Sequence, residues 1–255
     1  MKDKSLKVLL VTCISTLLFS GGMLIHNYLD SIRQNQKHQE LIHIVEESKD
    51  NEAMPYDEDT NFLAKYQELY KENNDMVGWI KIEDTPINYP VMQTIDKPNY
   101  YLRRGFDKQY TVYGLPYIQE NCDLEIPSDN LIIYGHHMND GSMFASLMKY
   151  TNRSYWEKHK LITFDTINQH NEYEIFAAFK TTAYSDDEES FKYYRFINAE
   201  DEEDFKQFIT KCKELSFYDT EITPTYGDKL VTLSTCEYSL KNGRIVVVAR
   251  KVDKT

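Results

Sequence analysis

The chain opens with an apolar segment that is long enough to cross a membrane. Residues 8–25 carry no charge, and lysines precede them at positions 2, 4 and 7. As a helix, these eighteen residues span about 27 Å at about 1.5 Å each, close to the hydrocarbon thickness of a bilayer. Because positive flanks stay in the cytoplasm, we expect residues 1–26 to form an uncleaved anchor, with the rest of the chain outside. The alternative is a cleaved signal peptide, although no A-x-A cleavage pattern follows the segment.

The polar stretch after the apolar segment predicts a helical spacer. Residues 27–59 are mixed in charge, contain no glycine and place only a thin stripe of apolar residues at helical spacing. Residues 61–74 return to clear helical spacing. The apolar face of this second helix consists of Phe62, Tyr66, Leu69 and Tyr70. We therefore interpret residues 27–75 as a spacer followed by a helix that packs on the next domain.

From residue 76 onward, short runs rich in β-branched and aromatic residues predict strands. These runs cover residues 78–82, 87–91, 131–134, 161–164, 173–182, 230–235 and 244–252. Segments with helical spacing interrupt them at residues 142–150 and 199–215, and the second has acidic residues first and lysines later, as the helix dipole favours. The pattern predicts a mainly β domain over residues 76–255, closed into a barrel, with a long helix before the last two strands.

Composition excludes several classes of protein. The 29 Lys and Arg against 41 Asp and Glu give a net charge of −12, which argues against a general nucleic-acid binder. Hydrophobic residues make up 41% of the chain, enough for a real core. Four cysteines in 255 residues are too few for a disulfide scaffold.

The position of Cys236 favours thiol chemistry. Cys236 follows the run 230–235, where we expect a strand to open into a loop. A thiol in that place is held by a rigid element and still reaches solvent, as a nucleophile requires. A buried edge thiol explains the placement equally well. Cys212 lies mid-helix and is interpreted as a packing residue, whereas Cys122 lies in a polar loop.

Candidate partners for this thiol lie at two other strand ends. His136 and His137 follow Gly135 at the end of the run 131–134. They suit a general base or a metal site, but no Cys or carboxylate stands near them at metal-ligand spacing. Arg244 begins the last strand, eight residues after the cysteine, and a hairpin of that length can bring its guanidinium beside the thiol. There its fixed charge can stabilise an oxyanion. His159 and His170 lie in polar contexts and are interpreted as surface groups.

Together these segments resemble a known family. The sequence Thr232-Leu233-Ser234-Thr235-Cys236, followed by Arg244, resembles the TLxTC…R signature of the sortases. The segment 134–144 (YGHHMNDGSMF) is similar to the catalytic-histidine segment of class B sortases. The N-terminal anchor and the long helix before the cysteine strand also match that class. The resemblance extends over residues 76–252.

The resemblance implies a membrane-anchored cysteine transpeptidase outside a Gram-positive cell. Such an enzyme cleaves a C-terminal sorting signal after Thr, holds the protein as a thioacyl intermediate and passes it to an amine on a cell-wall precursor. Carried over to this sequence, Cys236 is the nucleophile, His136 the general acid and base, and Arg244 the residue that positions substrate and stabilises the oxyanion. His137 is the other candidate histidine. The resemblance implies neither a cofactor nor a metal.

Three further residues flank the nucleophile in this interpretation. We expect Ser234 and Thr235 to shape the pocket floor and the backbone N–H of Glu237 to donate to the oxyanion. The chain departs from the family between Gly114 and Cys122, where Gln119 stands in place of an aspartate. This departure leaves the substrate contacts open.

The sequence leaves several alternatives open. The sorting signal is N-P-x-T-x-like or S/P-P-x-T-G-like, and the acceptor amine is not specified by the sequence. Pilin polymerisation is the other role within the family. Outside it, the alternatives are a thiol peptidase or hydrolase, a non-catalytic peptide-binding surface domain, and a metal site built from His136, His137 and Cys236.

Overall fold

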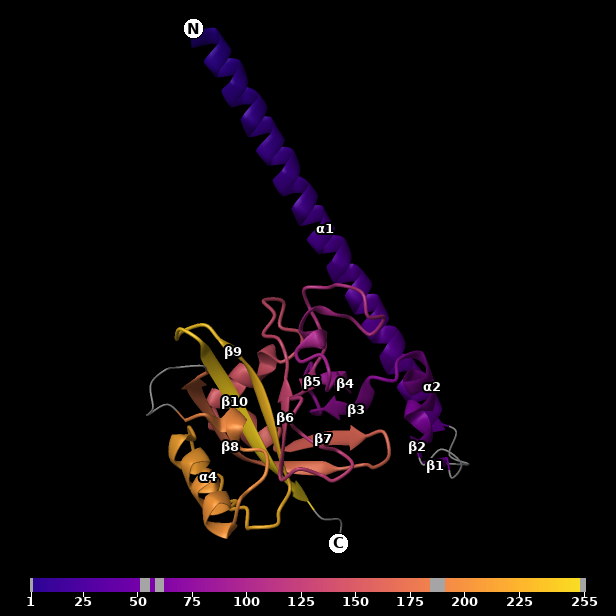
Figure 1. Ribbon diagram of the computed structural model, residues 1–255, viewed down its shortest axis with the longest axis vertical. Helices are drawn as coiled ribbons and strands as arrows, with labels where there is room; N and C mark the ends of the chain where they lie inside the picture. The colour runs from indigo at the N-terminus through magenta and orange to yellow at the C-terminus, as the bar shows by residue number, and fades with distance from the viewer. Residues whose placement is uncertain (1, 51–55, 58–61, 184–190, 253–255) are drawn as a thin grey trace. The chain divides into compact units, whose positions relative to one another are not determined.

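The computed structural model describes residues 2–50, 56–57, 62–183 and 191–252 (Figure 1). The chain divides into two units, Met1–Leu41 and Ile42–Thr255. Helix α1, Lys2–Asp50, begins in the first unit and ends in the second. Among the described residues, one stretch of helix, Leu6–Ser48, is long and apolar enough to cross a membrane, and its apolar side chains at residues 8–25 are exposed. Residues 51–55 and 58–59 of the predicted spacer lie outside the described residues.

The second unit is a closed β-barrel, as the sequence predicts. Within the described residues, its strands follow the order β10-β8-β7-β3-β4-β5-β6-β9 around the barrel. Neighbouring strands are antiparallel, except that β4 pairs with β5 and β6 pairs with β9 in parallel. The strands are β3 (Met76–Lys81), β4 (Asn88–Met92), β5 (Tyr117–Ile118), β6 (Asn130–Tyr134), β7 (Leu161–Thr166), β8 (Glu172–Thr182), β9 (Leu230–Glu237) and β10 (Gly243–Val252).

Two strand predictions need correction. The sequence pattern does not reveal β5, because it has only two residues and follows the glycine and proline of a loop-like segment. The pattern also ends the cysteine strand too early. β9 continues through Cys236 to Glu237, because β10 pairs with it along its whole length. Cys236 therefore lies inside a strand and not where a strand opens into a loop.

The helices differ from prediction mainly at their ends. Helix α2 (Ala64–Glu72) begins after a two-residue strand, β2 (Phe62–Leu63), which pairs with β1 (Tyr56–Asp57). The segment predicted as a helix over 142–150 is a 3₁₀ helix, η2 (Ala145–Thr151). Helix α4 (Glu202–Leu215) is capped by Asp201, whose carboxylate accepts a hydrogen bond from the N–H of Asp204 at 2.9 Å. Shorter elements escape prediction: η1 (Tyr100–Arg103), α3 (Arg153–Lys158) and η3 (Tyr193–Arg195).

Helix α4 lies against the barrel and covers part of its core (Figure 1). Its buried face packs with side chains of β8 and β10. The buried residues of this face are Phe205, Phe208, Ile209 and Cys212. Cys212 is fully buried, which confirms its interpretation as a packing residue. Because β10 is the direct neighbour of β9, these contacts hold the cysteine strand in a rigid frame.

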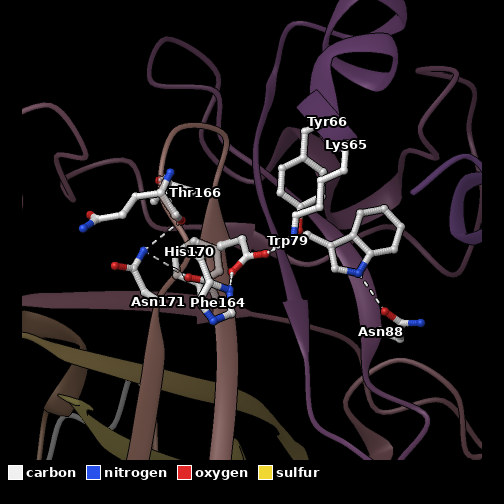
Figure 2. Close-up of polar contacts among 10 residues, drawn as sticks. Lys65, Tyr66, Trp79, Asn88, Phe164, Thr166, His170 and Asn171 are labelled. Atoms are coloured by element: carbon white, nitrogen blue, oxygen red, sulfur yellow. Dashed lines mark hydrogen bonds and ion pairs between the residues drawn. The ribbon is translucent and has the colours of Figure 1, made fainter. Parts of the chain in front are cut away.

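A buried carboxylate attaches helix α2 to the barrel. The side chain of Asp165 on β7 is only 2% exposed. It is contacted by Lys65 and by the hydroxyl of Tyr66, which donates a hydrogen bond at 2.7 Å. Nδ1 of His170, from the turn after β7, lies 2.7 Å from the other carboxylate oxygen. Figure 2 shows Lys65, Tyr66 and His170 around this point. His170 is therefore not a plain surface group, because its ring contacts a buried anion.

Candidate active site

Two parallel strands bring the histidine segment beside the cysteine. β6 and β9 pair in register, with Tyr134 opposite Ser234 (Figure 1). The N–H of Gly135, directly after β6, donates to the carbonyl of Ser234 at 3.1 Å. A side chain at Gly135 would collide with the ring of Phe144, because an added Cβ would lie 2.6 Å from it. Glycine therefore allows the ring of Phe144 to pack directly against the backbone just before His136.

The antiparallel pair β9–β10 places Arg244 opposite Cys236. The register makes these two residues direct partners across the strands. Side chains of such partners lie on the same face of the sheet, with Cβ atoms about 4.5–5.5 Å apart. Nη1 of Arg244 donates to the carbonyl of Gly243 at 2.8 Å, which holds the guanidinium. The hairpin expected from the sequence therefore does bring the arginine beside the thiol.

These side chains line one cavity with a volume of about 310 Å³. Cys236, His136 and Arg244 all contribute to its wall, and so do Ser234 and Thr235. The side chain of Glu237 lies outside this wall. The remaining lining comes from Asn99, Leu102, Tyr117, Tyr134, Gly135, Ala183, Tyr193 and Tyr194.

His136 is held through one ring nitrogen. Its Nε2 lies 2.7 Å from the carbonyl of Leu102. Because a carbonyl only accepts, Nε2 carries the proton and Nδ1 is the nitrogen suited to proton exchange. Burial lowers the pKa of His136, the bond to Leu102 partly opposes this, and the charge of Arg103 lowers the pKa further. The imidazole is therefore mainly neutral at pH 7.

His137 has a different environment from its neighbour. Its Nδ1 lies 2.9 Å from the backbone carbonyl of Cys236, and its ring packs beside Tyr238 with ring centres 5.2 Å apart. It does not line the cavity. The two histidines therefore do not converge on one point, as a metal site would require. Among the described residues, no group of three or more His, Cys, Asp and Glu side chains is placed to hold a metal ion.

The residues on either side of Cys236 in the sequence are buried. The hydroxyls of Ser234 and Tyr193 are 2.6 Å apart, whereas the hydroxyl of Thr235 has no hydrogen-bond partner within the described residues. The carboxylate of Glu237 accepts from Lys180 at 3.0 Å and from Ser239. Burial alone would raise the pKa of Glu237, but the hydrogen bonds from Ser239 and Lys180 outweigh it and lower the pKa to about 2. The carboxylate is thus ionised and structural.

The other thiols of the barrel unit are poor nucleophiles. Cys122 is buried, and its sulfur lies 3.5 Å from both the carbonyl of Asn130 and the N–H of Ile132. Burial raises the pKa of Cys122 to about 11 and that of Cys212 well above its ordinary value. Cys236, by contrast, is partly exposed to the cavity. Among these three thiols, Cys236 alone lines the cavity and is within reach of a substrate there.

The cavity wall also contains residues that the sequence does not single out. Tyr193 and Tyr194 come from η3, and Asn99 precedes η1. Asn99 accepts a hydrogen bond from Tyr117 at 2.8 Å. No local pattern marks them, because they meet only through the fold. Gln119, which departs from the family pattern, accepts from the hydroxyl of Tyr134 at 3.0 Å.

Comparison with known proteins agrees with this geometry. A family model described as a sortase domain matches residues 80–252. The chain belongs to the sortase family. Sortase B of Staphylococcus aureus is 37% identical over 191 residues, which cover 73% of this chain and 74% of that protein. Sortase B of Listeria monocytogenes is 31% identical over 261 residues, which cover 100% of both chains.

Solved sortase structures share the fold. A complex of Staphylococcus aureus sortase B with substrate has a TM-score of 0.78 and 30% identity, and covers 89% of this chain and 100% of that one. Sortase B from Bacillus anthracis in complex with AAEK1 has a TM-score of 0.75 and 31% identity, with coverage of 89% and 100%. These relatives place this sortase in class B, which confirms the resemblance drawn from the sequence.

Membership in the family establishes the reaction type. This sortase is a cysteine transpeptidase that acts on substrates bearing a sorting signal. The hydrolase and non-catalytic alternatives are not favoured. Sortases are cell-surface enzymes, and the exposed apolar helix at the N-terminus is consistent with a membrane anchor.

Proposed function

We propose that Cys236, His136 and Arg244 carry out the transpeptidation. The observation that carries this proposal is the direct pairing of Cys236 with Arg244 across β9 and β10, in a cavity that His136 also lines. A thiol, a mainly neutral imidazole and a fixed cation meet there. These are the groups that acyl transfer through a thioester requires.

The first half of the reaction forms the thioacyl intermediate. The sulfur of Cys236 attacks the carbonyl carbon of the signal's Thr, and the thiol proton passes to Nδ1 of His136. Arg244 stabilises the oxyanion that forms on the carbonyl oxygen, with the backbone N–H of Glu237 as the proposed second donor. The C–N bond then breaks, and His136 returns the proton to the leaving amine.

The second half transfers the acyl group to an amine. His136 takes a proton from the incoming amine as the amine attacks the thioester carbonyl. The C–S bond breaks, and the proton on His136 returns to the sulfur of Cys236. Ser234 and Thr235 form the proposed floor on which the scissile bond rests.

The proposed substrates are surface proteins with an N-P-x-T-x-like or S/P-P-x-T-G-like signal, cleaved after Thr. The proposed acceptor is an amine of a peptidoglycan precursor. A sortase B has been solved in complex with triglycine, whose terminal amine exemplifies such an acceptor.

The proposed topology follows from the charges around the apolar helix. The lysines at positions 2, 4 and 7 keep the N-terminus in the cytoplasm. Residues 1–26 form the anchor, 27–75 the spacer and its helix, and 76–255 the extracellular catalytic domain.

Product analysis tests the substrate and the acceptor together. The protein without residues 1–26 is incubated with peptides of both signal types, with and without triglycine, and the products are identified by mass spectrometry. We expect cleavage after Thr. A ligated product should form only when triglycine is present. Cys236→Ala is the control and should give neither product. Cleavage that yields free acid equally with and without triglycine would contradict the transfer to an amine.

A further inference from the structure

His137 links the two halves of the catalytic site without lining the cavity. It directly follows His136, and its Nδ1 contacts the backbone carbonyl of Cys236, 99 residues later in the chain. The contact is short, at 2.9 Å. It therefore joins the turn that carries the acid and base to the strand that carries the nucleophile.

The contact replaces a backbone bond that β6 no longer supplies. β6 ends at Tyr134, and its last partner on β9 is Ser234. The N–H of Gly135 still reaches the carbonyl of Ser234. The carbonyl of Cys236, two residues further along, points to the same side of β9, because carbonyl direction alternates along a strand. The side chain of His137 donates a hydrogen bond to this carbonyl, because the backbone after Gly135 no longer runs beside β9.

The chemistry of the contact fixes the ring's protonation. A carbonyl accepts only, so Nδ1 of His137 must carry the proton. Tyr238 adds a second link, because its ring lies beside the imidazole and its hydroxyl donates to the carbonyl of His137 at 3.3 Å. The backbone of this turn leads away from β9, because the N–H of Phe144 donates to the carbonyl of His136 and His137 bridges to Met143. His137 and Tyr238 thus connect the turn after Gly135 to the cysteine strand.

The position of the bond ties it to the reacting atoms. The carbonyl of Cys236 belongs to the same peptide group as the N–H of Glu237. A hydrogen bond to that carbonyl fixes the plane of the peptide, and with it the direction of the proposed oxyanion donor. It also fixes the backbone from which the sulfur projects. A misplacement of about 1 Å between reacting groups can cost about a hundredfold in rate.

We propose that His137 is a positioning residue, whose Nδ1–H bond to the carbonyl of Cys236 holds the nucleophile and the His136 turn in register. This inference rests on the proposed roles of Cys236 and His136. It predicts that the donor at Nδ1 matters for turnover, and that the aromatic ring matters only for packing on Tyr238.

Two substitutions separate the donor from the ring. In His137→Asn, the side-chain amide N–H occupies nearly the place of Nδ1–H, but the ring is lost. In His137→Phe, the ring remains beside Tyr238 and the donor is lost. We expect His137→Phe to lower kcat about tenfold to a hundredfold at unchanged KM, whereas His137→Asn should stay within about threefold of the wild type. Thermal unfolding of each variant shows whether the fold is intact.

A second readout does not depend on transpeptidation. The rate at which a small alkylating reagent modifies Cys236, measured against pH, reports the environment of the sulfur. His137→Phe should shift this profile, whereas His137→Asn should keep the profile of the wild type. Because no peptide is involved, this result stands even if no tested peptide is ligated, which separates failure of this inference from failure of the proposed function.

Clear outcomes overturn the inference. The inference is wrong if His137→Phe keeps the kcat and the alkylation profile of the wild type. It is also wrong if both variants lose kcat equally and the loss follows their loss of thermal stability. If His137→Phe does not fold, nitrogen NMR of the wild-type protein tests the inference instead, because it shows which nitrogen of the His137 ring carries the proton. A proton on Nδ1 at neutral pH is the expected result, and a neutral ring with its proton on Nε2 would refute the bond.

Discussion

Replacing Arg244 with lysine tests the electrostatic part of the mechanism. The arginine lies directly opposite Cys236, and one of its terminal nitrogens is held by the carbonyl of Gly243 at 2.8 Å. The planar guanidinium can keep this contact and still direct other N–H groups into the cavity. A lysine has a single nitrogen and cannot occupy both places. Its charge remains, so any loss of activity reports geometry.

The expected size of the effect follows from the role of the residue. Removing one donor to an oxyanion typically costs about 2.7–4 kcal/mol, or about 10²–10³ in kcat. We expect Arg244→Lys to lose kcat in this range, with KM changed by less than about fivefold. The fold should survive, because the position borders a cavity and both residues keep a charged end near solvent.

Steady-state kinetics on a cleavable sorting peptide measures the loss, and thermal unfolding checks the fold. Arg250→Lys on the same strand is the matched control. Arg250 faces Glu174 and Asp228 at 3.7 and 3.9 Å and does not line the cavity, so its kcat should not change. A kcat for Arg244→Lys within about threefold of the wild type would remove Arg244 from the oxyanion site.

The remaining predictions concern stability, protonation and the anchor. Asp165→Asn should destabilise the fold by about 3–5 kcal/mol, because it removes a buried anion from its contacts with Lys65, Tyr66 and His170. The unfolding midpoint should then fall by about 6–20 °C. Glu83→Gln, in an exposed pair with Lys81, should change the midpoint by less than about 2 °C, and equal midpoints for the two variants would contradict this role of Asp165. Arg103→Gln should raise the pKa of His136, because a nearby positive charge disfavours the imidazolium; NMR titration that shows an unchanged or lower pKa would refute this. Deletion of residues 1–26 should give a soluble domain with full activity on peptides, and a folded but inactive domain would count against a purely anchoring role.

Much of the fold can be predicted, because its signals are local. Most barrel strands are marked by β-branched runs, and helix α4 is marked by its acidic first turn and apolar stripe. β5 carries no such signal, because two residues cannot show a period. The length of β9 is set by its partner β10, which no local pattern records.

The proposed catalytic residues are identifiable for a related reason. Cys236 and Arg244 are close in sequence, so the length of one hairpin predicts their pairing. The histidine segment is distant, and only its resemblance to class B sortases connects it to the cysteine. The tyrosines of η3 that line the cavity cannot be found from the sequence, because they approach β9 only in the folded barrel. The same holds for the contact of His137, whose partner is a backbone carbonyl and leaves no trace in the sequence.

In the proposed mechanism, catalysis passes through a thioacyl bond on Cys236. Intact-protein mass spectrometry of the soluble domain, mixed with a sorting peptide in the absence of amine, measures that bond directly. The barrel unit offers three thiols, and peptide mapping distinguishes Cys236 from Cys122 and Cys212. We predict one adduct, on Cys236, that disappears when triglycine is added and never forms in Cys236→Ala. An adduct on another cysteine, or ligation that persists in Cys236→Ala, would contradict it.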